Sequence, residues 1–429
     1  MPTLIEIAAQ LSGYDPNALP VAQAQEFIAR LVPKVQAVEM LSLRSALGRV
    51  LARDLVSPFN VPASDNSAMD GYALRGSELN ALAPTRFAVA GSGLAGQPFD
   101  GAVPPGHCLR ITTGAVMPAG LDTVVPQEFT KLEGDAVNVP PGAVRSGDNR
   151  RLAGEDLAAG SPALHAGRRL RPADLGVIAS LGLAEVPLWR RLRVAFFSTG
   201  DELRSIGEPL DVGCVYDSNR YTLWGMLQRL NVEVLDLGVV RDDPAALEAA
   251  FRQAAASADA VITSGGVSVG EADHTKRIMA QLGEVLFWRI AMRPGRPMAI
   301  GRIGDADNAS ERGAILFGLP GNPVAVMVTF YAFVRDALLA MSGATAEPLP
   351  MLQAASVEAI RKKPGRTEYQ RGIVTRAPGG RWQVAITGSQ GSGILRSMSV
   401  ANGLVVLHHG QGNVAQGELV DVLPFDGLV

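Results

Sequence analysis

The feature of this sequence that most constrains its fold is a regular alternation of short apolar runs and helical patterns between residues 193 and 341. Apolar runs of strand length occupy 194–197, 232–237, 260–263 and 314–317, and apolar residues recur at helical spacing in 218–230, 244–256, 274–282 and 323–341. Strands that are separated by helices predict a mainly parallel sheet with helices on both faces. Ligands bind beyond the carboxyl ends of the strands in such a sheet, so we expect the site at that edge.

The rest of the sequence predicts further domains around this unit, as expected for a chain of 429 residues. Helical patterns come first, at 22–31 and 42–51, and helical spacing resumes at 173–183. Between them, Gly and Pro interrupt short β-type runs every few residues. The expected fold class is multidomain α/β, with a discontinuous helical N-terminal domain at 1–60 and 150–190, an inserted β-rich domain at 61–149, a doubly wound α/β domain at 191–343 and a small C-terminal β-barrel at 344–429.

Charge and cysteine content argue against several functional classes. The formal net charge of −3 is too small for a broad attraction to nucleic acid or to an anionic membrane, so we expect neither partner. The cysteines are Cys108 and Cys214, far apart and without metal-ligand spacing, which fits a reducing compartment. The N-terminus lacks the basic and apolar regions of a signal peptide. A cytoplasmic location is therefore expected.

Polar loops follow the predicted strands at their carboxyl ends, and four loops on one edge argue more strongly for a site than any one of them. They are 198–202 (STGDE), 240–243 (VRDD), 264–273 (SGGVSVGEAD) and 318–323 (GLPGNP). In the third loop, Gly265, Gly266 and Gly270 let backbone N–H groups face an anion, and Ser264 and Ser268 add hydroxyl donors. This pattern predicts a phosphate or pyrophosphate site. The alternative is an ordinary glycine-rich turn before a capping aspartate.

Carboxylates lie next to this predicted phosphate loop. Carboxylates in such a place can hold Mg²⁺, which neutralises the phosphate, and the candidates are Glu202, Asp242 and Asp273. The alternative is structural, with Asp201 and Asp243 as helix N-caps and Asp242 as a solvated turn residue. The three candidate carboxylates together indicate a metal site more strongly than any one of them alone.

Three arginines surround a Pro-Gly turn, at positions 289, 293 and 296. Guanidinium groups present planar donors that suit tetrahedral oxyanions, and Pro294 and Pro297 stiffen the turn that carries them. We therefore predict an oxyanion site here. A solvated basic loop is the alternative.

Four motifs occur in order along the chain: DNSAMDGYA at 65–73, STGDEL at 198–203, SGGVSVGEAD at 264–273 and GLPGNP at 318–323. Periodicity alone would make the first of them, and the polar stretches at 110–115 and 150–156, turns and caps. Together, the four motifs resemble the molybdopterin molybdenumtransferase family, known as MoeA in bacteria and as the E domain of gephyrin in animals. The resemblance covers essentially the whole chain, although SGGVSVG alone also occurs in molybdopterin adenylyltransferases.

The resemblance implies the last step of molybdenum cofactor synthesis. Enzymes of this family hydrolyse adenylylated molybdopterin, insert molybdate into its dithiolene and release AMP, with Mg²⁺ as helper. The resemblance also implies an elongated homodimer, whose active site lies between the molybdopterin-binding α/β domain of one subunit and the inserted domain of the other. Molybdopterin adenylyltransferase and molybdoenzyme chaperones are further candidate partners.

The resemblance also assigns functional roles to positions in this chain. Catalytic roles fall on Asp70, Thr113, Glu202, Asp242 and Asp273, the last three being the candidate metal ligands. Residues expected to bind molybdopterin or the nucleotide are Ser198, Thr199, Gly200, Ser264, Gly265, Gly266, Ser268, Gly270, Pro320, Gly321, Asn322, Arg151 and Asp156. Residues expected to bind molybdate are Arg289, Arg293, Arg296, Arg366 and Ser392. The chain departs from the family by having Arg at 289, 293 and 296 where Lys is usual, and Ala325 where many members have Ser.

Two other functions remain open at this point. An adenylyltransferase that acts one step earlier shares the α/β domain, but the flanking domains argue against it. A scaffold that has kept the fold, as the E domain of gephyrin organises receptors, is the alternative outside enzymes and is not expected as the main role. The sequence also leaves open whether molybdate or tungstate is preferred, and which carboxylate binds the metal.

Overall fold

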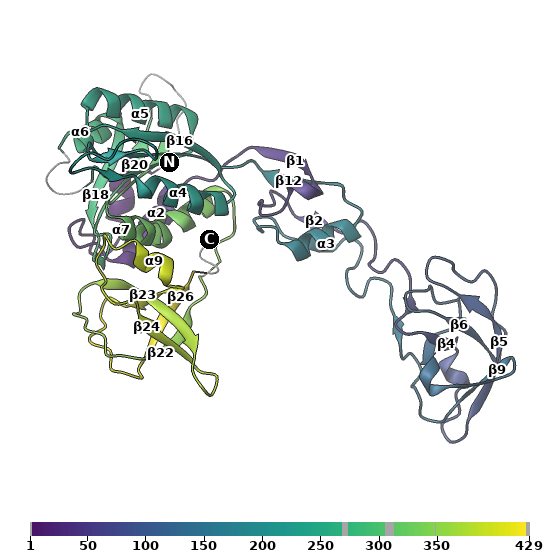
Figure 1. The fold of residues 1–429 in the computed structure, drawn as a ribbon. Coiled ribbons are helices and arrows are strands. Elements are labelled where there is room, and N and C mark those ends of the chain that lie inside the picture. Colours follow the sequence, from purple (N-terminus) through teal and green to yellow (C-terminus); the bar gives the residue numbers. More distant parts are fainter. Residues whose placement is uncertain (1, 268–272, 305–312, 348, 426–429) are drawn as a thin grey trace.

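The computed structural model describes residues 2–267, 273–304, 313–347 and 349–425. Its outline is elongated, with the α/β domain and the C-terminal barrel at one end and the inserted β-rich domain at the other (Figure 1). A slender arm joins the two ends (Figure 1). It consists of β1 (Val38–Ser42), β2 (Leu55–Val56), β11 (Pro162–Leu164), α3 (Pro172–Ser180) and β12 (Glu185–Trp189). The expected multidomain α/β fold is confirmed.

The α/β domain is built on one six-stranded sheet. In spatial order its strands are β16 (Glu233–Val240), β13 (Arg193–Thr199), β17 (Ala260–Ser264), β21 (Ala314–Leu319), β20 (Pro297–Ile303) and β18 (Gly283–Arg289). The first four strands run parallel, as the alternation predicts, whereas β20 and β18 form an antiparallel edge. These two strands flank the Pro-Gly turn and had not been predicted, because no helix separates them to produce the alternation.

Alternate side chains of β13 supply both faces of this sheet. Val194 and Phe196 enter one buried cluster, and Ala195 and Phe197 enter the other. The first face is covered by α2 (Val21–Leu31), α4 (Ser218–Arg229), α7 (Pro323–Thr329) and α8 (Arg335–Met341), and the second by α5 (Pro244–Ser257) and α6 (Asp273–Leu282). With both faces covered, the polar loops at the strand ends are left for a ligand.

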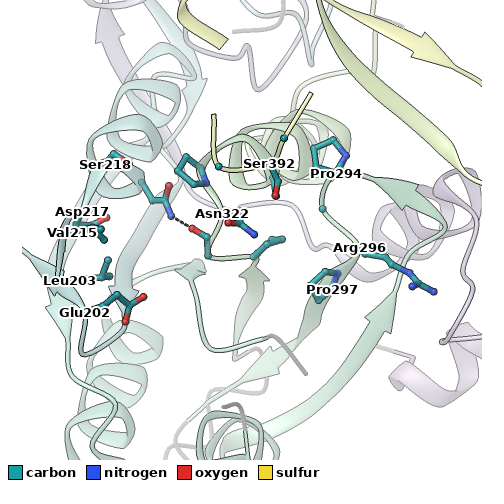
Figure 2. A pocket seen from close by; sticks show the side chains of 18 of the residues that line it. Glu202, Leu203, Val215, Asp217, Ser218, Pro294, Arg296, Pro297, Asn322 and Ser392 are labelled. Atoms are coloured by element: carbon teal, nitrogen blue, oxygen red, sulfur yellow. Dashed lines mark hydrogen bonds between the residues drawn. The ribbon is translucent and has the colours of Figure 1, made fainter. Parts of the chain in front are cut away.

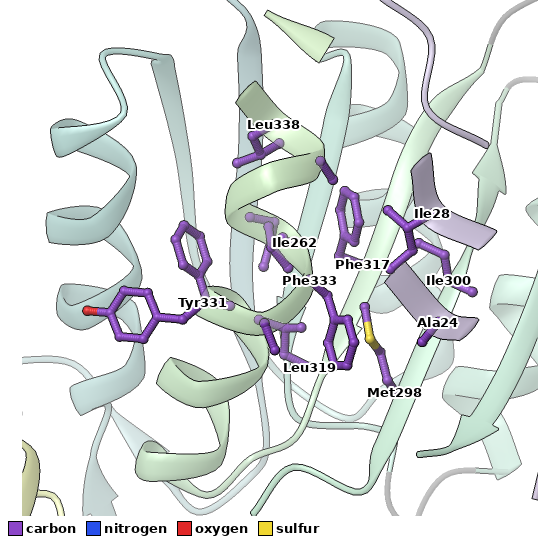
Figure 3. Packing of buried hydrophobic residues seen from close by; sticks show 14 of the residues in the cluster. Ala24, Ile28, Ile262, Met298, Ile300, Phe317, Leu319, Tyr331, Phe333 and Leu338 are labelled. Carbon is purple, nitrogen blue, oxygen red and sulfur yellow. The ribbon is translucent and has the colours of Figure 1, made fainter. Parts of the chain in front are cut away.

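A π-helical turn, Phe330–Val334, joins α7 to α8, so that one helical stretch runs from Pro323 to Met341. By length and hydropathy this stretch could cross a membrane, but 72% of its apolar window is buried inside the protein, as in a core helix. Its Phe333 and Leu338 lie in one cluster with Ile262 and Phe317 of the sheet (Figure 3).

The two N-terminal helices, α1 (Leu4–Ala9) and α2, pack against the α/β sheet and not with the arm. Phe27 of α2 meets the ring of Trp288 edge-on, with centroids 5.0 Å apart, and Ala24 and Ile28 lie in the same cluster (Figure 3). The expected grouping of these helices with residues 150–190 is therefore not seen. Their apolar faces are buried on the sheet instead.

The arm is held together by strand pairing, and the helix expected at 42–51 does not form. β1 pairs antiparallel with β12, and β2 pairs with β11. Among residues 42–51, all of which are described, only the 3₁₀ turn η1 (Leu43–Ser45) is helical. Gly48, with a φ of +72°, then turns the chain. Tertiary pairing with a distant strand has overridden the local helical spacing.

The inserted and C-terminal domains each contain one main sheet. In the inserted domain the strand order is β7 (Thr123–Pro126), β4 (Gly71–Leu74), β6 (His107–Ile111), β5 (Thr85–Gly93), β9 (Ala136–Val139) and β8 (Lys131–Glu133), while β3 (Asn66–Ser67) pairs with β10 (Arg150–Arg151). In the C-terminal domain, β23 (Thr367–Arg376), β24 (Trp382–Ile386), β22 (Leu352–Ser356), β26 (Leu419–Pro424) and β25 (Gly403–Leu407) close into a barrel. The barrel is tied to the α/β domain because β19 (Met292–Arg293) pairs with β23.

Polar contacts attach the arm to the α/β domain, and we call three of them the junction clamp. Arg190 binds the carboxylate of Asp259 with two hydrogen bonds of 2.7 and 2.8 Å. Arg169 donates to the backbone oxygen of Arg229 at 2.8 Å, and Asn231 donates to the backbone oxygen of Leu47 at 3.2 Å. The near end of the arm is therefore fixed to the α/β domain, and the inserted domain is held away from that domain (Figure 1).

Candidate active site

A pocket of about 880 Å³ opens at the carboxyl edge of the parallel strands, between the α/β domain and the barrel (Figure 2). Its wall is formed by the loop after β13, the start of α4, the turn before β20, the loop before α7 and one loop of the barrel. Predicted site residues in this wall are Glu202, Arg293, Arg296, Pro320, Gly321, Asn322 and Ser392. The wall also contains residues that had not been assigned to the site, among them Tyr216, Asp217, Ser218 and Asn219. Ala325 also lies in the wall and offers no hydroxyl there.

Two helices begin at this pocket. α4 starts after Asp217, whose Oδ1 accepts the amide of Arg220 at 3.0 Å, and α7 starts after Asn322, whose side chain makes no capping bond. The first N–H groups of a helix have no partner within the helix, and its N-terminal end carries a partial positive charge. At α7, Pro323 has no N–H and the amide of Val324 donates to the backbone oxygen of Ser392 at 3.1 Å, so what this helix start offers an anion is chiefly the positive end of its dipole.

The glycine-rich loop after β17 begins with two glycines in left-handed backbone conformations. Gly265 and Gly266 have φ values of +99° and +68°, in the region that favours glycine. A Cβ at Gly265 would lie 2.4 Å from the backbone oxygen of Thr199, so the loop passes too close to β13 for any side chain. The predicted ligand contacts of Ser268 and Gly270 lie outside the described residues.

Replacing Gly265 by Ala is expected to lower the free energy of unfolding by about 3 kcal/mol, because it combines an unfavourable φ with a steric overlap. Gly207→Ala is a matched control: its φ is +94°, but a Cβ there would meet no atom within 4 Å. The control should lose only about 1–2 kcal/mol, the cost of a left-handed conformation. Urea unfolding of both variants checks this, and equal losses would show that the contact with Thr199 is unimportant.

The acidic residues of the predicted metal site do not all have the environments that the sequence suggested. Asp242 accepts a short hydrogen bond from the hydroxyl of Thr199, and its own amide donates to Asp201 Oδ1 at 3.3 Å. Asp243 caps α5 by accepting the amide of Ala246 at 2.8 Å, as the structural alternative proposed. Asp201 caps no described helix, because Asp217 has that place at α4. Asp242 is therefore held in place by Thr199 and is not simply a solvated turn residue.

Of the three carboxylates predicted to bind Mg²⁺, the structure describes the side chains of Glu202 and Asp242. Within the described residues, no three His, Cys, Asp or Glu side chains gather into a metal cluster. Glu202 lies in the pocket wall, Asp242 follows the neighbouring strand β16, and the side chain of Asp273 is outside the description. Mg²⁺ is commonly bound by one or two carboxylates together with phosphate oxygens of the ligand. Glu202 and Asp242 are the described carboxylates that such a site could use, and Asp242 is not in the pocket wall. Ser198 and Thr199 end β13 and Gly200 follows it, and none of the three enters the pocket wall.

The arginines of the predicted oxyanion site are placed differently from one another. Arg293 and Arg296 are exposed and line the pocket, at a turn where a Cβ on Gly295 would lie 2.6 Å from Thr329. Neither makes an ion pair with a described carboxylate. In Figure 2, the Arg296 side chain extends away from Ser392 and Asn322, so it has to turn inward to share their ligand. Arg289 is exposed and is not in the wall.

The arginine that approaches the pocket from the barrel is Arg371, not the predicted Arg366. Arg366 is exposed and does not line the pocket. Arg371 is completely buried and donates to Ser397 Oγ at 2.9 Å and to the backbone oxygen of Gly391, a wall residue, at 3.0 Å. Burial, followed by the nearby charge of Arg293, lowers the pKa of its guanidinium. The signal in the sequence that could have identified Arg371 is the occurrence of an arginine within an otherwise strand-like run.

A second polar cluster lies in the inserted domain. Asp70 Oδ1 accepts hydrogen bonds from the backbone amide and the hydroxyl of Thr113, at 2.7 and 2.8 Å, and these two bonds hold the pKa of Asp70 below its usual value. Arg151 pairs with Asn66 across β10 and β3, next to the strand–loop turn that carries Asp70. Asp156 makes only a backbone contact, from its amide to the oxygen of Val61. Because the hydrogen bonds from Thr113 lower the pKa of Asp70, this carboxylate remains ionised at neutral pH.

The predicted site thus falls into two groups that the arm keeps apart within one chain (Figure 1). Apolar side chains are exposed beside both groups. Val212 and Val215 are 106% and 52% exposed in the segment that enters the pocket wall, and Met69, Val116 and Leu152 are 39–47% exposed beside the Asp70 cluster. Exposed apolar groups around polar ones are typical of surfaces that another molecule covers.

Comparison with known proteins matches three successive regions of the chain to known protein families. Residues 19–182 match a family described as MoeA N-terminal region (domain I and II), residues 195–340 match a probable molybdopterin binding domain, and residues 353–425 match the MoeA C-terminal region (domain IV). The three matched regions together span both β domains, the arm and the α/β domain.

Individual relatives match over nearly the whole length. A molybdopterin molybdenumtransferase of Haemophilus influenzae is 40% identical, with 96% of this chain and 100% of the relative covered. One of Nostoc is 37% identical, with coverages of 94% and 93%. The crystal structure of a molybdopterin biosynthesis moeA protein of Pyrococcus horikoshii superposes with a TM-score of 0.81 at 28% identity, over 95% of this chain and 100% of that one.

Proposed function

The chain belongs to the MoeA family of molybdopterin molybdenumtransferases, and on that premise we propose that its pocket hydrolyses adenylylated molybdopterin and transfers molybdate to the product. The observation that carries the proposal is the composition of a single pocket: two helix N-termini lie at one side, and at another lie Arg293 and Arg296, which make no ion pair with a described carboxylate. Such a pocket accommodates two anions, a phosphate chain and a tetrahedral oxyanion.

The residues would divide the work as follows. The starts of α4 and α7 and the glycine-rich loop bind the phosphates, so that water breaks the phosphoanhydride bond and AMP leaves. Arg293, Arg296 and Ser392 hold molybdate near the dithiolene that receives it. Glu202 and Asp242 would hold Mg²⁺, which supplies charge neutralisation of the phosphates. Arg371 orders the Gly391 loop of the wall from behind.

We further propose that the protein acts as a homodimer in which the Asp70 cluster completes the pocket of the other subunit. Three observations support this arrangement: the separation of the two groups by the arm, the ionised Asp70 held ready by Thr113, and the exposed apolar side chains around both groups. Molybdopterin adenylyltransferase would supply the substrate, and both cysteines being free fits the cytosol.

A reconstitution tests the proposal. The protein is mixed with adenylylated molybdopterin, molybdate and Mg²⁺, and AMP release and the activation of a molybdenum-free molybdoenzyme are measured. We expect both signals, with a strong loss when EDTA removes Mg²⁺ and no enzyme activation when molybdate is omitted. If the protein instead converted molybdopterin and ATP into the adenylylated compound, it would be an adenylyltransferase and the proposal would be wrong.

A further inference from the structure

Asn219, at the second position of α4, makes an unusual set of contacts for a residue that no motif pointed to. Its side chain is 7% exposed, and its Nδ2 donates to Ser264 Oγ at 2.8 Å and to the backbone oxygen of Gly321 at 2.7 Å. The second of these bonds is the dashed line in Figure 2. Asn219 thus joins the start of α4 to two different loops.

Those two loops follow neighbouring strands of the sheet. Ser264 ends β17 and begins the glycine-rich loop, while Gly321 follows β21 in the loop that begins α7. β17 and β21 are paired in parallel, and the amide of Gly265 donates to the oxygen of Leu319 at 3.1 Å. The strands therefore bring the loops together, and Asn219 is the side chain that connects both of them to the helix start at the pocket.

The orientation of this amide is determined by its partners. The Gly321 oxygen can only accept, so Nδ2 has to face it, and Oδ1 is left on the other side. Oδ1 is buried and has no hydrogen-bond partner among the described residues. Asn402 in the barrel shows the ordinary structural arrangement: its Nδ2 donates to the Val374 oxygen at 2.9 Å and its Oδ1 accepts the Val374 amide at 2.7 Å. Native proteins satisfy most buried polar atoms, so an exception such as Oδ1 of Asn219 calls for an explanation.

We propose that Asn219 is a positioning residue for the reaction of this pocket: its amide holds the Ser264 loop and the Gly321 loop at the spacing that the phosphorylated ligand requires. The inference rests on the proposed function, because it takes the ligand to be adenylylated molybdopterin. Asn219 acts through Ser264 and Gly321, so its loss should weaken ligand binding first and leave the chemical step less affected.

The test is Asn219→Asp, which keeps size and shape and replaces the donor by a carboxylate. Above pH 7 the carboxylate faces the Gly321 oxygen without a proton, so KM for adenylylated molybdopterin should rise about 10- to 100-fold over wild type, with kcat changed less. As the pH falls towards 5, protonation restores one O–H donor and the KM ratio should fall. The ratio is used because both proteins share the other charged and titratable groups around the pocket: Glu202, Asp217, Tyr216, Arg220, Arg293 and Arg296.

Asn402→Asp is the matched control, since it also breaks a side-chain bridge but lies outside the pocket. It should lower thermal stability without a pH-dependent KM ratio. A KM ratio for Asn219→Asp that stays near one, or that does not fall with pH, would overturn the proposal. If Asn219→Asp fails to fold, Ser264→Ala removes one of the two bonds, and an unchanged KM would then overturn it. If the wild-type protein itself released no AMP, the proposed function would be refuted, and not only the role of Asn219.

Discussion

Replacing Arg293 and Arg296 together by Ala is expected to abolish cofactor formation at low molybdate concentration while adenylylated molybdopterin still binds. The two guanidinium groups line the pocket without an ion-pair partner among the described carboxylates. A hydrogen bond to a charged group contributes about 1.5–3 kcal/mol, so losing two should weaken molybdate binding by about a hundredfold or more. Product formation should partly recover at high molybdate.

Two comparison variants sharpen this experiment. The double variant Arg293→Lys with Arg296→Lys keeps the charge and removes the planar fork of donors. The decrease in molybdate binding that it causes therefore measures the importance of guanidinium geometry. Arg289→Ala removes an arginine that was predicted from the sequence but lies outside the pocket wall, and its effect should be smaller. Molybdate dependence of enzyme activation and equilibrium binding of adenylylated molybdopterin are the two measurements. Loss of adenylylated molybdopterin binding in the double Ala variant would contradict the division into two anion sites.

Mixing an inactive Asp70→Ala chain with an inactive Asp242→Ala chain is expected to restore activity. In a mixed dimer, one pocket combines the intact α/β domain of the first chain with the intact inserted domain of the second. Random pairing makes half of the dimers mixed, each with one complete site of two, so about a quarter of wild-type activity should return.

The matched control for this mixing experiment is Asp70→Ala with Thr113→Ala. Both changes lie in the inserted domain, joined by hydrogen bonds of 2.7 and 2.8 Å, so every mixed dimer has a defect at both sites and no activity should return. AMP release is the measurement, on dimers verified to contain both chains. Equal recovery in the two mixtures, or none in either, would rule out the shared site.

The sequence predicted the parallel part of the α/β sheet well. Each strand there is a short apolar run, and the helix that follows it has apolar residues at helical spacing, so the two can be told apart. It failed where tertiary contacts decide the structure. Residues 42–51 have helical spacing, yet only Leu43–Ser45 is helical, and Val50 and Leu51 form β-bridges to Arg169 and Leu188. β18 and β20 were missed because they are adjacent strands joined by a short turn, which leaves no alternation to detect.

The candidate site was predicted where chemistry is visible in the residue type and missed where it depends on burial. Glu202, Arg293 and Arg296, which were chosen by residue type, line the pocket. Arg371 was missed in favour of Arg366, because the exposed fraction of an arginine cannot be read from a short β run. Asn219 contacts residues 45 and 102 positions away in the sequence, and at the start of a helix it looks like an ordinary N-terminal residue.

The junction clamp makes the arm a lever. Arg190 and Asp259 fix its near end, and Asp70 lies in the domain at its far end (Figure 1). Any rotation at the clamp is magnified at Asp70 in proportion to the length of the arm. In the proposed dimer, the angular rigidity of the junction clamp, remote from any reacting atom, would therefore affect how reproducibly the inserted domain reaches the other subunit.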